Sequence, residues 1–175
     1  AMLRDSGYEL ALFGKNHCLT DKAATRLFHK SFECMHDGYR SSDENLLQVN
    51  RWIAESGLLS APWGASVAPY PLSMAPTTVL TERAIEYLER ISRENKPFCV
   101  WLSYPDPHTP LQVPEPYASM YDLEEIELPE IECDLTTKPE RQSIARYMFA
   151  GDRVSDAQAR KCIAMYYGMM RLIDD

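Results

Sequence analysis

A chain of 175 residues, 45% of them hydrophobic and 25% charged, is long enough for one sizeable core and has the composition of an ordinary globular protein. We therefore expect a single domain over residues 1–175. The formal net charge of −8 argues against a general nucleic-acid-binding protein, which normally carries a basic face. No run approaches the roughly 18 apolar residues of a membrane span, and no signal peptide is visible, so no membrane partner is expected either.

The five cysteines are odd in number and widely scattered, a pattern typical of free thiols rather than of a disulfide framework. They are Cys18, Cys34, Cys99, Cys133 and Cys162. Free thiols favour a reducing, cytoplasmic compartment, although a parent protein that is exported stays open as an alternative.

The first part of the chain is predicted to supply one strand. Residues 1–6 are typical of the end of a helix, and Gly7 is well placed as its left-handed cap. Tyr8–Phe13 is mostly apolar and predicts a short strand, with residues 14–17 as the turn that leaves it. Residues 18–42 have no clear period and are expected to be irregular.

Two amphipathic helices are predicted next. Ser41-x-x-Glu44 fits a capping box, and Gly57 can end the helix that begins there. A proline-containing loop over residues 58–76 leads to a second helix over 77–95. The inward faces are expected to be Leu46, Val49 and Ile53 on the first helix, and Leu80, Ala84, Leu88 and Ile91 on the second.

The run Phe98–Leu102 is apolar throughout and is typical of a central strand of a parallel sheet, buried on both faces. The segment after it contains prolines at positions 105, 107, 110, 114 and 116 and predicts a rigid, extended loop without helix or sheet. His108 lies in this loop, just past the carboxyl end of the strand, where open α/β sheets bind ligands. We expect an α/β fold with a mostly parallel sheet flanked by helices.

The carboxyl-terminal part is predicted to be helical after an acidic segment. Residues 122–134 contain seven acids and no base, which is typical of a solvated segment. A helix is expected over 139–149, and Ser155-x-x-Gln158 fits a second capping box. The helix that this box begins carries a 3–4–3 stripe, expected to be core, formed by Ile163, Tyr166, Met170 and Ile173.

Three basic side chains follow the two predicted strands. Lys15 and His17 come after the first strand, and His108 comes after the second. If both strands lie in one parallel sheet, the three side chains converge at one edge and suit a tetrahedral oxyanion such as sulfate or phosphate. The alternative is that Lys15 is solvated and each histidine caps a turn.

Three segments resemble one known family. LRDSGYELALFGKNHC resembles the sulfatase segment GY-x-T-x-x-x-GK-W-H, and PFCVWLSYPDPHTPLQVPEPYASMY resembles PFFLFLSFPDPHTPYQVPEPY of the same family. YYGMMRLIDD resembles the family's YYGMI-x-x-IDD helix. The three segments occur in the family's order and cover roughly a third of the chain, which makes the match more specific than any single motif.

The resemblance implies a role for each basic residue. The family's sulfate-contacting lysine falls on Lys15, the histidine that hydrogen-bonds the formylglycine nucleophile falls on His17, and the histidine that contacts the sulfate ester falls on His108. The implied reaction is hydrolysis of a sulfate ester, in a small molecule or a sulfated glycan. The implied cofactors of a complete enzyme are formylglycine and a divalent cation, with Ca²⁺ expected.

The chain also departs from the family pattern. Asn16 replaces the family's common tryptophan, a change expected to be tolerated. No Cys or Ser is followed by x-Pro-x-Arg, and the family's aspartate metal pairs are absent, with Asp174 and Asp175 read as helix-end acids instead. We therefore expect an inactive internal fragment of an alkaline-phosphatase-like domain that binds no metal and self-associates through an unpaired sheet edge.

Two alternatives stay open at this point. A phosphonate monoester or phosphodiester hydrolase shares the same superfamily scaffold. A non-catalytic zinc-binding or interaction module would use His29, Cys34 and His36, with His17 and Cys18 nearby, although this spacing fits no standard zinc finger.

Overall fold

The computed structural model describes most of the chain, in two compact units. The described residues are 2–34, 43–58, 63–129, 134–149 and 151–175. One unit comprises Ala1–Trp52 with Tyr70–His108, and the other comprises Ile53–Pro69 with Thr109–Asp175. None of the helices in these stretches combines the length and the apolar content required to cross a bilayer.

The first unit contains a three-stranded parallel sheet, in the order β2-β1-β4. Its strands are β1 (Glu9–Gly14), β2 (Lys30–Glu33) and β4 (Phe98–Ser103). The register pairs Glu9 with Phe98 and Gly14 with Ser103, so β1 and β4 begin and end level with each other. The predicted α/β class is confirmed, and β1 and β4 are paired in one parallel sheet.

The prediction that Phe98–Leu102 is a central strand buried on both faces is wrong. Among the described strands, β1 lies in the middle and carries the buried pattern, whereas β4 pairs with β1 alone. Phe98 is 41% exposed and Leu102 is 37% exposed. A continuous apolar run predicts a strand, but its place in the sheet depends on long-range pairing that the run does not encode.

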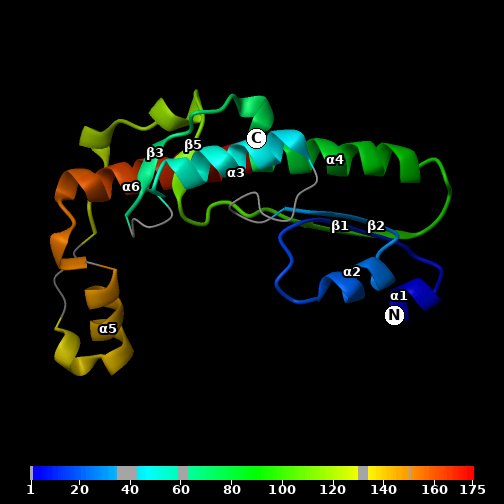
Figure 1. Ribbon diagram of the computed structural model, residues 1–175, viewed down its shortest axis with the longest axis horizontal. Coiled ribbons are helices and arrows are strands. Elements are labelled where there is room, and N and C mark those ends of the chain that lie inside the picture. Colours follow the sequence, from blue (N-terminus) through cyan, green and yellow to red (C-terminus); the bar gives the residue numbers. More distant parts are fainter. Residues whose placement is uncertain (1, 35–42, 59–62, 130–133, 150) are drawn as a thin grey trace. The chain divides into compact units, whose positions relative to one another are not determined.

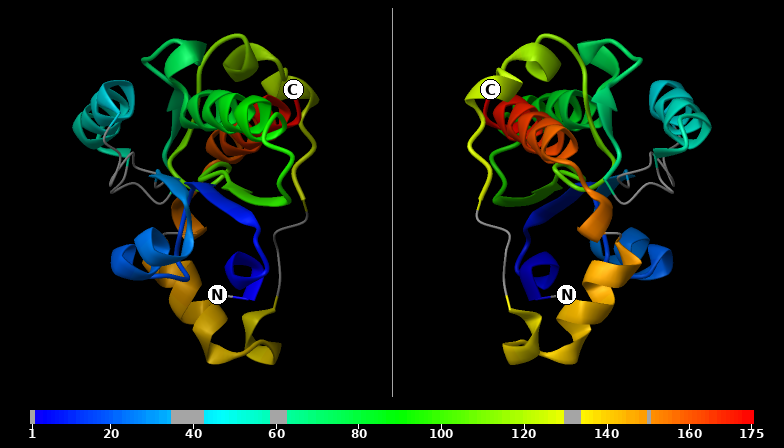
Figure 2. Two further views of the ribbon diagram at one scale, coloured as in Figure 1. Left: turned by 90° about the vertical axis from the view of Figure 1, so that its right-hand side faces the viewer. Right: turned by 90° about the vertical axis from the view of Figure 1, so that its left-hand side faces the viewer.

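Helices cover both faces of this sheet (Figures 1 and 2). α4 (Pro76–Ile91) lies over one face, and α1 (Met2–Asp5) and α2 (Asp21–Leu27) lie over the other. α3 (Glu44–Glu55) adds Leu46 to the core beside α4. The core consists of Ala11, Phe13, Cys34, Leu46, Val79, Leu80, Ala84, Tyr87 and Ile91.

Several local predictions for this unit need correction. Residues 18–42 are not irregular throughout, because Thr20 caps α2 and β2 extends the sheet. Asp43 caps α3, since its carboxylate accepts from the backbone N–H groups of residues 45 and 46, whereas Ser41 lies outside the described residues. On α4, Leu88 is 37% exposed and Tyr87 is buried instead.

The second unit is organised around the long helix α6 (Asp156–Asp174), which packs against β3 (Ala65–Val67) and β5 (Leu111–Val113). β3 and β5 form a parallel pair, so the predicted loops over residues 58–76 and after Ser103 each contain a short strand. The remaining helix is α5 (Glu140–Met148), as predicted. Short 3₁₀ turns are found at Leu72–Met74 in the first unit and at Tyr117–Ser119, Leu123–Glu125, Leu135–Thr137 and Gly151–Arg153 in the second.

The stripe predicted for α6 is the wrong face of that helix. Tyr166 and Met170 are exposed, and the buried face is formed by Cys162, Ala164, Met165, Gly168, Met169 and Leu172. Two apolar stripes with helical spacing run side by side here, so periodicity does not choose between them. Ser155 does cap the helix, although Gln158 donates its side-chain N–H to the Trp63 carbonyl instead of completing the capping box.

Candidate functional site

The loops that carry the predicted site residues leave the same edge of the sheet. β1 ends at Gly14 and β4 ends at Ser103, and these two residues are register partners in a parallel pair. The backbone N–H of Lys15 donates to the Ser103 carbonyl at 2.8 Å, so the two chains stay paired where they leave the sheet. In open α/β sheets this carboxyl edge is where ligands bind.

Gly14 is required by the geometry of this exit. Its φ of +98° is in the left-handed region, and a Cβ built on it would lie 2.0 Å from the Ser103 carbonyl oxygen. Only glycine permits both the backbone conformation and the close approach of the two strands. The Gly-Lys pair of the sequence motif is therefore the point at which β1 turns into the Lys15 loop.

Asn16 holds the loop that contains Lys15 and His17. It is 3% exposed, and its side-chain oxygen accepts from the backbone N–H groups of Cys18 at 3.1 Å and Leu19 at 3.0 Å. Its side-chain N–H group donates to the Leu19 carbonyl at 3.1 Å. This is the turn-forming use of asparagine, in which the side chain bonds to the backbone that follows it.

The two neighbours of the buried asparagine differ in their exposure. Lys15 is partly buried, whereas His17 is exposed. The Asn16 amide also lies 3.5 Å from Glu33, the last residue of β2. Asn16 was expected only to tolerate its position, and its turn-forming role was missed, although the asparagine-rich character of turns is a signal that could have found it.

His108 is exposed and lies in a loop fixed by its own backbone. The N–H of His108 donates to the Pro105 carbonyl at 3.2 Å, which closes a turn. The neighbouring side chains bind α4: Thr77 donates its hydroxyl to the Asp106 carboxylate at 2.6 Å, and the Thr81 and Tyr104 hydroxyls lie 2.6 Å apart. These contacts were not predicted, because nothing local in the sequence pairs residues so far apart.

Asp106 is an acid of this loop whose carboxyl pKa departs from its ordinary value. Burial raises the pKa of its carboxyl above the ordinary value of 3.8, and the hydrogen bond from Thr77 opposes that rise. Burial also raises the pKa of Tyr70, with Asp106 as a second cause. The carboxyl group therefore lies in a poorly solvated environment two residues before His108.

The structure brings the Lys15–His17 loop and the His108 loop to one edge, but the role of each side chain stays a prediction. The arrangement can offer an ammonium group and two imidazoles to a ligand. Such groups bind oxyanions and, in the case of imidazole, exchange protons near neutral pH.

The described residues contain no cluster of three or more histidine, cysteine, aspartate or glutamate side chains that could hold a metal ion. The two acids at the end of α6 are occupied by other contacts. Asp174 lies 3.7 Å and Asp175 lies 2.5 Å from the Arg171 guanidinium, and Asp175 also accepts from the Tyr117 hydroxyl at 3.1 Å. These contacts agree with helix-end acids.

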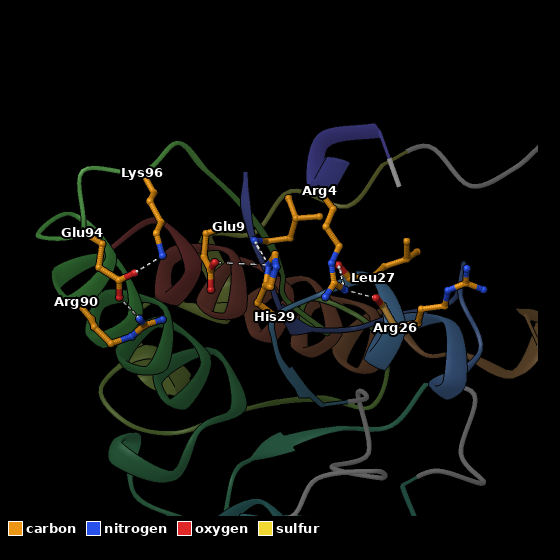
Figure 3. Close-up of polar contacts among 9 residues, drawn as sticks. Arg4, Glu9, Arg26, Leu27, His29, Arg90, Glu94 and Lys96 are labelled. Atoms are coloured by element: carbon orange, nitrogen blue, oxygen red, sulfur yellow. Dashed lines mark hydrogen bonds and ion pairs between the residues drawn. The ribbon is translucent and has the colours of Figure 1, made fainter. Parts of the chain in front are cut away.

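The zinc cluster suggested by the sequence is not formed by the described residues. His29 precedes β2 at the amino edge of the sheet, where its Nδ1 accepts from the Leu10 N–H at 2.9 Å and lies 3.7 Å from Glu9 (Figure 3). Cys34 follows β2 and lies five residues after His29, a separation of roughly 16 Å in an extended chain. The sheet therefore separates His29 from Cys34, while His36 lies outside the described residues.

Comparison with known proteins gives consistent matches that cover between 73% and 99% of the chain, and a family model that covers all of it. A family model described as Sulfatase matches residues 1–175. The chain is 27% identical over 209 aligned residues to the multifunctional alkaline phosphatase superfamily protein PehA of Trinickia caryophylli, covering 99% of the chain and 40% of that protein. It is 28% identical over 129 residues to an arylsulfatase of Clostridium perfringens, covering 73% of the chain and 24% of that protein.

Solved structures give the same fold. The phosphonate monoester hydrolase SpPMH of Silicibacter pomeroyi superposes with a TM-score of 0.67 at 20% identity, over 98% of this chain and 40% of that one. The phosphonate monoester hydrolase of Agrobacterium radiobacter superposes with a TM-score of 0.55 at 18% identity, with the same coverage. The chain thus spans about 40% of the length of these relatives.

Proposed function

This chain belongs to the sulfatase family, and from that premise we propose that it supplies the anion-binding part of a site that hydrolyses sulfate esters. The observation that carries the proposal is the shared exit of the two loops from adjacent parallel strands, joined by the bond from the Lys15 N–H to the Ser103 carbonyl. Lys15, His17 and His108 are the residues proposed to meet the anion.

Each of the three side chains has a distinct task in this proposal. The Lys15 ammonium neutralises the charge of the sulfate oxygens, and His108 donates a hydrogen bond to the ester group. His17 would hold the attacking group of a complete site through a hydrogen bond from its imidazole. Asn16 binds the backbone of Cys18 and Leu19 and so fixes the turn that contains His17.

The family's chemistry includes a formylglycine nucleophile and a divalent cation, with Ca²⁺ as the expected ion. The described residues do not fit either group, because they form no set of three metal ligands, and the sequence contains no Cys or Ser followed by x-Pro-x-Arg. No step of the reaction is therefore assigned to these groups in this chain. In the proposal, other segments supply them.

The proposed substrate is a sulfate ester, in a small molecule or a sulfated glycan. A phosphonate monoester or a phosphodiester is the second candidate, because the chain resembles a multifunctional superfamily protein and phosphonate monoester hydrolases as well as an arylsulfatase. Both substrate classes present a tetrahedral oxyanion to the same three side chains.

Sulfate binding to the chain tests the proposal without requiring turnover. We expect Lys15→Ala to weaken sulfate binding about tenfold or more, since a charge-assisted hydrogen bond contributes about 1.5–3 kcal/mol. Isothermal titration calorimetry at fixed ionic strength measures the dissociation constant. Lys30→Ala is the matched control, because Lys30 begins β2 at the opposite edge of the sheet. Equal effects of the two substitutions would contradict the proposal.

Activity assays separate the substrate classes. The 175-residue chain, incubated with an aryl sulfate and Ca²⁺, is expected to release no phenol, and measured turnover would overturn that expectation. A longer polypeptide that also contains the nucleophile and metal segments of the family should hydrolyse aryl sulfates faster than phosphonate monoesters or phosphodiesters. The reverse order of rates would favour the second candidate.

A further inference from the structure

We propose that Thr77 and Asp106 form a clamp that positions His108, by fixing the His108 loop to the first turn of α4. This inference rests on the proposed function of His108 and extends it to residues that do not themselves meet the anion. Asp106 and Thr77 are positioning residues in this proposal.

The first turn of α4 lacks a cap from its own segment. Ala75 precedes the helix and provides no side-chain hydrogen bond, and Pro76 occupies the first turn. Thr77 is 3% exposed, and its hydroxyl donates to the Asp106 carboxylate at 2.6 Å. A carboxylate near a helix amino terminus is also stabilised by the helix dipole. The acid near the amino terminus of α4 therefore comes from the His108 loop and not from the segment that precedes the helix.

A second contact lies one helical turn further along α4. The Thr81 hydroxyl donates to the Thr77 carbonyl at 2.9 Å and lies 2.6 Å from the Tyr104 hydroxyl. Because a hydroxyl has only one hydrogen to donate, Tyr104 is then the donor to Thr81. α4 therefore holds the loop at two positions, residues 104 and 106, on either side of the buried Pro105.

The two contacts bracket the turn on which His108 depends. The His108 N–H donates to the carbonyl of Pro105, the residue between the two held positions. Tyr104 directly follows Ser103, whose carbonyl accepts from the Lys15 N–H. The backbone from Ser103 to His108 is consequently fixed at the sheet, at α4 and within its own turn. Loss of the Thr77–Asp106 bond should release the part nearest to His108.

The test compares substitutions at two adjacent threonines of α4. Thr77→Ala removes the hydroxyl donor, Thr77→Ser keeps it, and Thr78→Ala is the matched control, since no side-chain hydrogen bond of Thr78 is found within the described residues. We expect Thr77→Ala to raise the amide exchange rate of His108 and to weaken sulfate binding, each about tenfold, which is the effect of losing about 1.4 kcal/mol. Thr77→Ser and Thr78→Ala should match the wild-type chain.

A second pair of variants keeps the test decisive if Thr77→Ala fails to fold. Asp106→Asn retains an oxygen that accepts from Thr77 and should preserve both readouts within about threefold, whereas Tyr104→Phe should raise the His108 exchange rate by about threefold or more. An unchanged exchange rate in Thr77→Ala, or in Tyr104→Phe if Thr77→Ala does not fold, would overturn the clamp. Failure of the proposed function looks different, because the wild-type chain itself would then not bind sulfate.

Discussion

At the scale of single residues, the site depends on a few side chains that determine where the backbone leaves the sheet. Gly14 allows β1 and β4 to stay paired up to the bond between Lys15 and Ser103. Asn16 then turns the chain so that Lys15 and His17 lie on either side of a buried residue. The basic residues are proposed to bind the anion. The neutral residues Gly14 and Asn16 determine where the Lys15–His17 loop lies.

Replacement of Gly14 tests how much the pairing of β1 and β4 at their carboxyl ends depends on the close approach of the two backbones. Gly14→Ala should lower the free energy of unfolding by about 2 kcal/mol or more, since it combines a strained φ with a collision against backbone. Gly7→Ala is the matched control, because Gly7 also has a positive φ, of +82°, but has no atom within 4 Å of a built Cβ. Chemical denaturation measures both variants, and an equal loss in the two would contradict the role assigned to close approach.

Some residues of the candidate site can be predicted from the sequence, and others cannot. Lys15, His17 and His108 were identified because basic residues after apolar runs are visible locally, and the family motifs include them. Asp106 and Thr77 were missed, because they are 29 positions apart and meet only after α4 has packed on the sheet. Asn16 was underestimated because its partners, Cys18 and Leu19, are backbone groups.

At the scale of elements, apolar periodicity predicted the presence of helices and strands better than it predicted which of their faces are buried. α4, α5 and α6 and the strands β1 and β4 were all expected near their observed positions. The short elements α2, β2, β3 and β5 were missed, because three to seven residues contain too little periodicity to identify. The buried face of α6 was misassigned because two apolar stripes compete.

Gly168 identifies the buried face of α6 and provides a test of it. A Cβ at this position would lie 2.5 Å from the Tyr117 carbonyl oxygen and 3.1 Å from a Val113 methyl group. Gly168→Ala should therefore destabilise the chain by about 1 kcal/mol net, because overpacking costs about 1–3 kcal/mol and helix propensity returns about 1 kcal/mol.

Thermal unfolding compares Gly168→Ala with Gly151→Ala. A Cβ at Gly151 would have the flexible Arg146 side chain as its nearest neighbour, at 3.2 Å, so this control should have little effect. A stabilised Gly168→Ala variant would show that the helix does not pack as closely here as the structure indicates.

At the scale of the whole molecule, β4 has an open edge among the described strands. We propose that the chain self-associates, because β4 pairs only with β1 among the described strands and exposes Phe98 and Leu102. An apolar strand with an open edge is a template for pairing with another chain. Light scattering after size-exclusion chromatography should show a mass that increases with concentration.

Leucine-to-lysine substitutions locate the contact. Leu102→Lys should reduce self-association by placing a charge on the edge strand. Leu47→Lys should not, although Leu47 on α3 is equally exposed, at 37%. A wild-type chain that stays monomeric at every concentration, or equal effects of the two substitutions, would argue against the β4 edge.

Lys15, His17 and His108 are proposed to surround one anion, and a sulfate titration followed by NMR of the imidazole signals measures whether they do. The chain contains only four histidines, so each signal can be assigned by substitution. We predict that the His17 and His108 signals shift together with one shared dissociation constant, while the His29 signal at the opposite edge of the sheet does not move when sodium chloride keeps the ionic strength constant. Different dissociation constants for His17 and His108, or a shift in only one of them, would contradict a shared anion site.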